Sequence, residues 1–174
     1  MWKKWRKYEE IPHLREFAAK AGVSELVAAA LWHRGQRTPE AVQAFLYPEE
    51  QPFHEPLLMK DMEKAVARIT QALERQEKIV VYGDYDVDGM TATALMLHNL
   101  RALGADVDFY IPDRKSEGYG FNLGALEKIA ADGAGLLVSV DCGIASCEDV
   151  AAMQGRLDII ITDHHLPGTA LPPA

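Results

Sequence analysis

The stretch IVVYGDYDVDG, residues 79–89, decides the fold of this chain, because a strongly apolar run leads directly into a series of acids. Three aspartates, Asp84, Asp86 and Asp88, occupy alternate positions after the run. Strands this apolar are typical of parallel sheets that are covered on both faces. Such sheets bind their ligands outside the carboxyl ends of the strands. The stretch therefore predicts a strand of an α/β sheet with an acidic site at its end.

Two further apolar runs end in the same way. LLVSVD, residues 136–141, leads to Asp141, and DIIITDHH, residues 158–165, leads to Asp163 followed by two histidines. Parallel strands would gather up to five carboxylates and two imidazoles at one edge of the sheet. Ionised carboxylates held this closely repel one another unless cations neutralise them, and oxygen ligands mixed with imidazole suit Mn²⁺ or Mg²⁺. We interpret this edge as the metal site of a hydrolase.

The rest of the chain predicts an α/β domain that follows a small helical region. Short helices are expected at residues 14–19 and 23–32, and Thr38-Pro39-Glu40 is typical of the start of a third. Prolines at 48, 52 and 56 indicate a linker. We expect a helical amino-terminal region with its linker at residues 1–57 and the α/β domain at residues 58–174.

Within the second region, helical and strand patterns alternate. Helices are predicted around residues 62–73, 92–103 and 146–154, and strands at residues 79–82, 107–111, 136–140 and 158–162. Alternation at this spacing favours right-handed crossovers and a doubly wound, mostly parallel sheet.

Composition fits a globular protein. The chain has 174 residues, 48% of them hydrophobic, and no apolar run approaches the ~20 residues needed to cross a bilayer. No signal-peptide pattern follows the first residues, so we expect a cytoplasmic protein without membrane contact. The cysteines at 142 and 147 lack the spacing of zinc sites and are expected to be reduced thiols.

The net charge of −8 is unevenly distributed. Residues 81–174 hold 14 acidic against 5 basic side chains, whereas residues 1–80 hold 12 against 13. Bound divalent ions would offset the acidity where a phosphate would lie, so the charge does not exclude a polyanionic substrate. The basic and tryptophan-containing residues 2–7 could grip nucleic acid or form a solvated terminus.

Three other interpretations fit the acidic stretch less well. An EF-hand loop beginning at Asp84 would need a glutamate at its twelfth position, where the chain has Leu95, and a helix before it, where the chain is strand-like. A phosphoacceptor receiver domain would need a lysine near the pocket and has no use for paired histidines. Helix capping by aspartate explains one such residue better than three.

Taken together, the motifs resemble those of the DHH phosphoesterases. VVYGDYDVDGMTA from residue 80 is similar to the first motif of that family, VSVDCGI from residue 138 to the second and ITDHH from residue 161 to the third. The stretch YIPDRKSEGYG, residues 110–120, Arg34-Gly35 and the segment from Thr38 resemble the RecJ-type single-strand DNA exonucleases more closely than other branches. The resemblance covers most of the chain from about residue 30.

This resemblance implies a site for two ions, Mn²⁺ or Mg²⁺. Asp86 and Asp141 match ligands of the first ion, and Asp88, Asp141 and His164 match ligands of the second, so Asp141 would bridge. Relatives in the pyrophosphatase branch carry a histidine where this chain has Tyr82, and Asp84 is expected to supply the missing ligand.

The remaining site residues are also assigned by resemblance. His165 is expected, with Asp141, to be catalytic, and it would contact the scissile phosphate or the attacking water. Asp163 would orient His164 by a hydrogen bond.

The glycine-containing loop that follows residues 107–111 is a flexible surface turn or a substrate contact. In the second interpretation Arg114 offers charge and Tyr119 stacking or a phosphate contact, while Ser116 and Gly120 lie beside the phosphate or a base.

The implied activity is 5′ to 3′ hydrolysis of single-stranded DNA to mononucleotides in recombination and repair, with single-strand-binding protein and helicase as further partners. Two alternatives stay open, a DHH phosphodiesterase for oligonucleotides or cyclic dinucleotides and a non-catalytic DHH scaffold in replication or repair. The family's fourth motif and second domain do not follow ITDHH, so we expect an amino-terminal piece with an incomplete DHH core, inactive alone.

Overall fold

The computed structural model describes residues 9–174, so the basic cluster of residues 2–7 lies outside the described part. The chain divides into two compact units, Met1–Pro56 and Leu57–Ala174.

The first unit contains three short helices, as the sequence predicts. They are α1 (Leu14–Ala21), α2 (Glu25–His33) and α3 (Pro39–Leu46), and 3₁₀ turns follow at Pro48–Glu50 and Pro56–Leu58. The hydroxyl of Thr38 accepts a hydrogen bond from the backbone N–H of Ala41 at 3.1 Å, which satisfies an otherwise free donor at the start of α3. A small core joins the helices, formed by Phe17, Ala18, Ala21, Ala28, Leu31 and Val42.

The second unit is built on a four-stranded, fully parallel sheet with the order β2-β1-β3-β4. The strands are β1 (Lys78–Gly83), β2 (Val107–Tyr110), β3 (Ala134–Val140) and β4 (Asp158–Thr162). Gly83 pairs with Val140, and Val140 pairs with Thr162. Because the last residues of three neighbouring strands are in register, the aspartate that follows each strand leaves the sheet at the same level.

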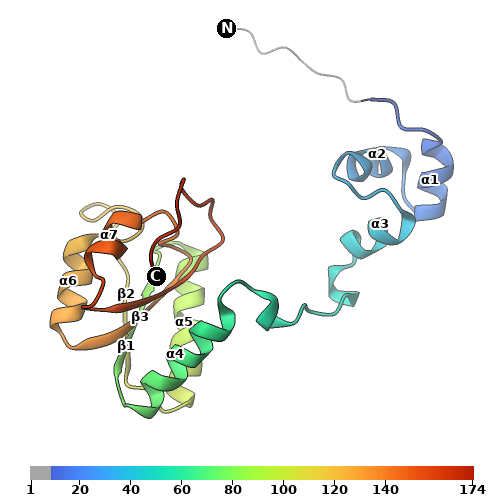
Figure 1. The fold of residues 1–174 in the computed structure, drawn as a ribbon. Coiled ribbons are helices and arrows are strands. Elements are labelled where there is room, and N and C mark those ends of the chain that lie inside the picture. Colours follow the sequence, from blue (N-terminus) through green and yellow to red (C-terminus); the bar gives the residue numbers. More distant parts are fainter. Residues whose placement is uncertain (1–8) are drawn as a thin grey trace, which may run out of the picture. The chain divides into compact units, whose positions relative to one another are not determined.

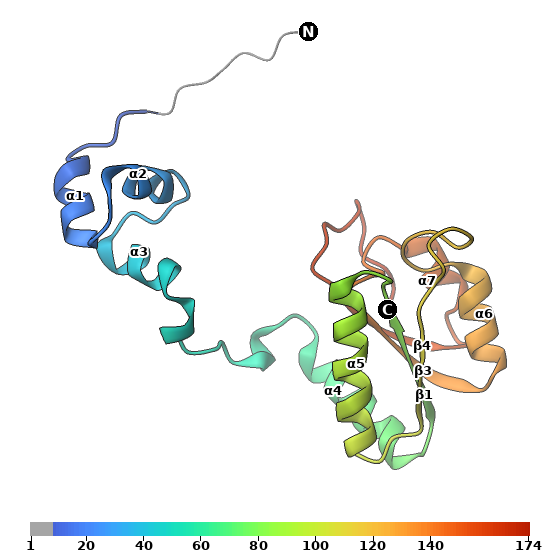
Figure 2. The ribbon, with the colours of Figure 1, turned by 180° about the vertical axis from the view of Figure 1, so that it is seen from behind.

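Helices cover both faces of this sheet, which confirms the doubly wound α/β fold. Figures 1 and 2 show α4 (Met62–Glu74) and α5 (Val87–Ala102) on one side, and α6 (Leu123–Ala131) and α7 (Cys147–Ala152) on the other. Alternate strand residues supply the two cores, as the period of a strand requires. The α4–α5 face contains Ile79, Val81, Leu136 and Val138, and the α6–α7 face contains Val80, Tyr82, Leu137 and Ile159.

The structure differs from the sequence prediction at three helices. Helix α6 was not predicted, although the Asn122 side chain accepts a hydrogen bond from Ala125 N–H at 2.8 Å and Gly133 follows the helix with a positive φ of 87°. Helix α5 begins at Val87 rather than at residue 92, so the last aspartate of the first motif lies inside its first turn. Helix α7 is shorter than the predicted 146–154.

None of the helices in the described part of the chain is long and apolar enough to cross a membrane.

Candidate metal centre

The aligned strand ends bring carboxylates and imidazoles together, as the sequence predicts. One carboxylate oxygen from each of Asp84, Asp86 and Asp141 lies within 4.8 Å of the others. A second group has the same spacing and joins Asp141 to ring nitrogens of His164 and His165. Asp141 belongs to both groups and lies at the end of β3, between the other two strands.

Asp141 is buried and has an unusual backbone conformation. Its φ is 64°, in the left-handed region that most side chains avoid and that aspartate, asparagine and glycine tolerate. Its N–H donates to the carbonyl of Thr162 at 2.9 Å, which extends the contact between β3 and β4 by one residue. The turn after β3 therefore starts at the residue that carries the central carboxylate.

Asp84 is buried, with 3% of its surface exposed. Burial raises the pKa of this carboxyl, and the nearby charges of Asp86 and Asp141 raise it further. The N–H of Tyr85 donates to Asp84 Oδ1 at 2.8 Å, and this hydrogen bond lowers the pKa of Asp84. The three carboxylates thus concentrate negative charge that a bound cation would relieve.

A glycine lets the first turn of α5 approach this buried acid. A Cβ atom at Gly89 would lie 2.6 Å from the backbone nitrogen and oxygen of Asp84. Any side chain there would force the helix away from the end of β1.

The other two acids of the first motif differ in position. Asp86 caps α5, because its Oδ1 accepts a hydrogen bond from Gly89 N–H at 3.0 Å, and it also belongs to the first acidic group. Capping, weighed as an alternative for these aspartates, is therefore observed for this one. Asp88 lies in the first turn of α5, is exposed, and belongs to neither group among residues 9–174. Its role as a ligand stays a prediction.

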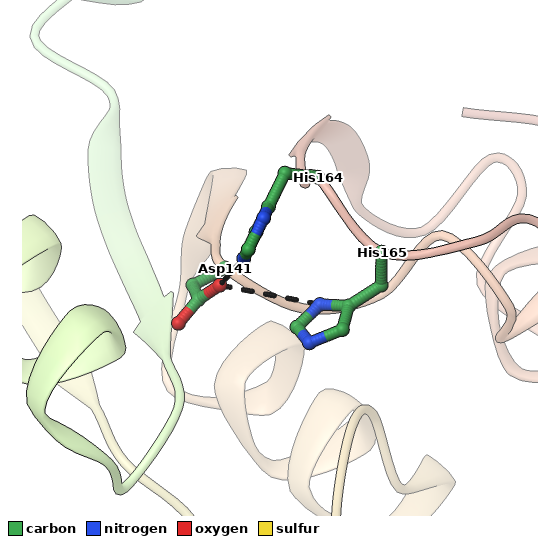
Figure 3. Close-up of side chains that lie close together, drawn as sticks. All are labelled: Asp141, His164 and His165. Atoms are coloured by element: carbon green, nitrogen blue, oxygen red, sulfur yellow. Dashed lines mark ion pairs between the residues drawn. The ribbon is translucent and has the colours of Figure 1, made fainter. Parts of the chain in front are cut away.

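The two histidines make different contacts (Figure 3). Nε2 of His164 is 2.9 Å from Oδ1 of Asp141, whereas Nδ1 of His165 is 4.0 Å from the same oxygen. Nδ1 of His165 is also 2.8 Å from Oδ1 of Asp163. Asp163 therefore contacts His165, whereas the resemblance implies that it orients His164.

The turn after β4 explains this difference. Asp163 Oδ1 accepts a hydrogen bond from the backbone N–H of His165 at 3.0 Å, and its Oδ2 accepts one from Ile144 N–H at 3.0 Å. An aspartate that bonds the backbone two residues ahead brings the side chain of that residue onto its own carboxylate. Burial opposes ionisation, but these hydrogen bonds and His165 prevail and lower the pKa of Asp163. The hydrogen bond between His165 and Asp163 raises the pKa of His165.

The predicted substrate loop reaches the site through Tyr119. Its hydroxyl oxygen lies 2.9 Å from Nδ1 of His165 and 3.3 Å from the backbone carbonyl of Asp141. The guanidinium of Arg114 lies over the ring of Tyr85, 5.3 Å from its centroid.

Ser116 and Gly120 have structural contacts within the loop. The Ser116 hydroxyl donates to Asp113 at 2.9 Å, and the Gly120 carbonyl accepts a hydrogen bond from the Tyr82 hydroxyl at 3.0 Å. Contacts of the loop residues with a substrate stay a prediction.

Sequence reasoning missed Glu117, which holds this loop. Its carboxylate accepts hydrogen bonds from the hydroxyl of Tyr110, from Asp113 N–H at 2.8 Å and from Asn122 Nδ2 at 3.2 Å. Tyr110 at the end of β2 and Asn122 at the start of α6 could have indicated this role in the sequence, because both are polar residues that flank the loop.

The donor set fits a hard divalent cation. Atoms within 4.8 Å of one another can surround an ion whose bonds to oxygen are ~2.0–2.6 Å long. Carboxylates with imidazole suit Mn²⁺ or Mg²⁺, whereas burial raises the pKa of the nearby Cys142 thiol to about 12 and keeps it protonated. Asp84, Asp86 and Asp141 could hold one ion, and Asp141 and His164 could take part in a second, whereas Nδ1 of His165 is engaged by Asp163.

Comparison with known proteins agrees with this geometry. The family described as DHH family, N-terminal domain, matches residues 78–174, which include every strand and the whole site. This chain belongs to the DHH family. Membership of the DHH family accounts for the aspartates at the strand ends and the histidine pair after β4.

Curated relatives of this DHH chain are named single-stranded-DNA-specific exonuclease RecJ. The protein from Bacillus subtilis is 49% identical over 151 residues, which cover 86% of this chain and 19% of the relative. The protein from Thermus thermophilus is 37% identical over 162 residues, covering 91% of this chain and 23% of the relative. The chain thus spans about a fifth of the length of these curated relatives.

Solved structures of RecJ share the fold. An exonuclease RecJ bound to manganese superimposes with a TM-score of 0.65 at 38% identity and covers 70% of this chain and 31% of its own. The Thermus thermophilus RecJ in complex with Mn²⁺ superimposes with a TM-score of 0.64 at 33% identity, and the match covers 92% of this chain and 22% of that structure. Its complex with Mg²⁺ superimposes with a TM-score of 0.52 at 32% identity, and the match covers 87% of this chain and 18% of that structure.

Proposed function

We propose that this chain carries the metal-binding part of a hydrolase that degrades single-stranded DNA from its 5′ end to mononucleotides, in recombination and repair. The observation that carries the proposal is the position of Asp141, whose carboxylate belongs to both groups of candidate ligands. The names of the similar RecJ proteins and their Mn²⁺ and Mg²⁺ complexes support the substrate and the metals.

In this proposal Asp84, Asp86, Asp88, Asp141 and His164 hold two ions, with Asp141 shared between them. Divalent ions bound there would neutralise phosphate charge and activate water for in-line attack at phosphorus. Asp88 would have to reach the site from the first turn of α5. The spacing of the remaining carboxylates already suits coordination without a change of backbone.

The other site residues act on the substrate. Asp163 holds Nδ1 of His165, which leaves the lone pair of Nε2 to accept a proton from the attacking water, and the protonated ring could then donate to a phosphate oxygen. Arg114 offers positive charge to the strand, and Tyr119, Ser116 and Gly120 form the loop that faces it.

A segment exchange tests this function. Residues of this chain that match the Bacillus subtilis relative replace the corresponding segment of that protein, and the chimera is incubated with end-labelled single-stranded DNA and Mn²⁺. We expect metal-dependent release of mononucleotides from the 5′ end and little release from duplex DNA. The same chimera with Asp141→Asn should lose at least ~10³-fold in activity, since one carboxylate serves both ions.

The products separate this function from the two alternatives. Cleavage limited to short oligonucleotides or cyclic dinucleotides would indicate the small-substrate phosphodiesterase. A folded chimera that binds Mn²⁺ but hydrolyses none of these substrates would indicate a non-catalytic scaffold, and either result would refute the exonuclease.

A cytoplasmic location and contacts with single-strand-binding protein and helicase belong to the same proposal. The relatives are bacterial, and bacterial chromosomal DNA lies in the cytoplasm. Cell fractionation and co-purification with these two proteins would test both points.

A further inference from the structure

Tyr119 links two strand ends of the metal centre. Its hydroxyl oxygen lies 2.9 Å from Nδ1 of His165, which follows β4, and 3.3 Å from the backbone carbonyl of Asp141, which follows β3. Its ring meets the imidazole edge to face, with centroids 5.5 Å apart and an interplanar angle of 72°. The side chain is 51% exposed, so these contacts are made at the open side of the site.

The partners determine how the protons are arranged. Asp163 already accepts two backbone N–H groups and is ionised, so it can only accept at the 2.8 Å contact with His165 Nδ1. Nδ1 must therefore carry the proton and donate it. The Tyr119 oxygen lies 2.9 Å from Nδ1 and 3.5 Å from Nε2, so it approaches the ring away from the direction of the Nδ1–H bond, and its own proton is free to bond the carbonyl of Asp141.

The contact with Asp163 selects one tautomer of His165. With the proton on Nδ1, the neutral ring keeps a lone pair on Nε2. The hydroxyl bridge also restricts rotation of the ring, because Asp163 and Tyr119 contact the same nitrogen from two separate elements.

The loop that carries Tyr119 is itself anchored. Glu117 accepts three hydrogen bonds that tie the loop to β2 and to the start of α6, and the buried hydroxyl of Tyr82 donates to the carbonyl of Gly120. The backbone on both sides of Tyr119 is therefore held, which is what a side chain needs in order to position another one.

We propose that Tyr119 is a positioning residue for His165: the Tyr119 hydroxyl ties the imidazole to the backbone of Asp141 and restricts rotation of the ring. The catalytic consequence rests on the function proposed above, whereas the structural link does not. The proposal assigns the effect to the hydroxyl group, and a role in stacking on a DNA base would instead need only the aromatic ring.

The structural link is tested on the 174-residue chain itself by nitrogen-15 NMR of the histidine rings, without metal. Tyr119→Phe should shift the ring nitrogen signals of His165, because the ring loses the hydroxyl beside it, while the backbone amides of the sheet stay in place. Tyr47→Phe, which removes a hydroxyl from the first unit, is the matched control. Unchanged His165 ring signals in the folded Tyr119→Phe protein would overturn the proposal.

Kinetics in the chimera separate positioning from stacking. A positioning hydroxyl predicts that Tyr119→Phe lowers kcat by roughly 10-fold at unchanged KM and unchanged Mn²⁺ affinity. Stacking predicts that Tyr119→Phe behaves like the parent and that Tyr119→Leu raises KM, which would refute the proposal.

The double variant Tyr119→Phe with His165→Ala identifies the route of the effect. If Tyr119 acts through His165, the double variant should be no slower than His165→Ala alone. Full additivity would contradict the proposal. Activity of His165→Ala equal to that of the parent would refute the catalytic role assigned to His165 in the proposed function, while the NMR result on the structural link would stand.

Discussion

Nε2 of His164 and Oδ1 of Asp141 lie 2.9 Å apart across the ends of the neighbouring strands β4 and β3. The next histidine approaches the same oxygen only to 4.0 Å and instead contacts Asp163 at 2.8 Å. The adjacent imidazoles therefore have separate environments: one lies against the shared carboxylate, and the other is held by Asp163.

Substitution of each histidine should give a different defect. His164→Ala removes a nitrogen beside Asp141 and is expected to weaken Mn²⁺ binding by roughly 10-fold or more. His165→Ala should change Mn²⁺ affinity little and lower kcat in the chimera. Calorimetric Mn²⁺ titrations of both variants check this, and the reverse order of affinities would show that the roles are exchanged.

Two glycines in the first turns of helices offer a matched test of close packing. Gly89→Ala places a Cβ atom 2.6 Å from the backbone of Asp84 and should cost about 1–3 kcal/mol. At the exposed Gly124 a Cβ atom would meet Asn122 Oδ1 at 3.7 Å, so Gly124→Ala should be neutral or add ~0.5–1 kcal/mol.

Urea unfolding of both glycine variants measures these free energies. Gly89→Ala should also weaken Mn²⁺ binding, because the displaced backbone carries Asp84. Equal stability of the two variants would show that α5 moves away from β1 without cost.

Arg68 on α4 joins the starts of two strands. Its Nη2 lies 2.6 Å from Glu77 and its Nε 2.7 Å from Asp158, and its side chain is 20% exposed. Arg68→Ala should lower the free energy of unfolding by about 1–3 kcal/mol, because Glu77 would remain half-buried without this partner.

Arg75→Ala is the control for this effect. Its guanidinium lies 3.7 Å from the same glutamate but is 64% exposed, so the loss should stay within about 0.5 kcal/mol. Chemical denaturation compares the variants, and similar losses would mean that burial of Arg68 contributes little.

Glu117 should give the protein an acid-sensitive contribution to stability. The Tyr110 hydroxyl, followed by the N–H of Asp113, lowers the pKa of this carboxyl below its usual 4.5. The folded state therefore holds the proton less tightly than the unfolded state. The stabilisation is complete above pH 4.5 and is lost as the pH falls through the lower folded-state pKa.

Glu117→Gln tests this dependence. The variant should be less stable than the parent at neutral pH, and the difference should shrink in acid below pH 4.5. Unfolding measured across this range, with the exposed Glu74→Gln on α4 as control, would reject the link if the difference did not change with pH.

The sequence predicted the sheet and the acidic edge because both depend on local patterns. Each apolar run that ends in aspartate is a strand in the structure, and parallel strands in register carry Asp84, Asp141 and Asp163 to one edge. Helix α6 is short and follows the glycine-containing loop directly, so its start at the capping residue Asn122 does not stand out in the sequence.

Contacts between distant segments could not be read from the sequence. No pattern indicates that Tyr119 reaches the backbone of Asp141, because that approach depends on the hydrogen bonds of Glu117 and Tyr82. The partner of Asp163 was assigned by resemblance, and the actual choice of His165 follows from the turn after β4.

The left-handed backbone of Asp141 restricts how the site can change during evolution. At a φ of 64° asparagine and glycine fit without added strain, whereas most other residues would cost ~1–2 kcal/mol. The substitutions that best preserve the fold are therefore also ones that remove the shared carboxylate. A single step such as Asp141→Asn would remove the shared carboxylate and leave the backbone unstrained, so descendants of this fold that lack this ligand are easily reached without an intermediate that fails to fold.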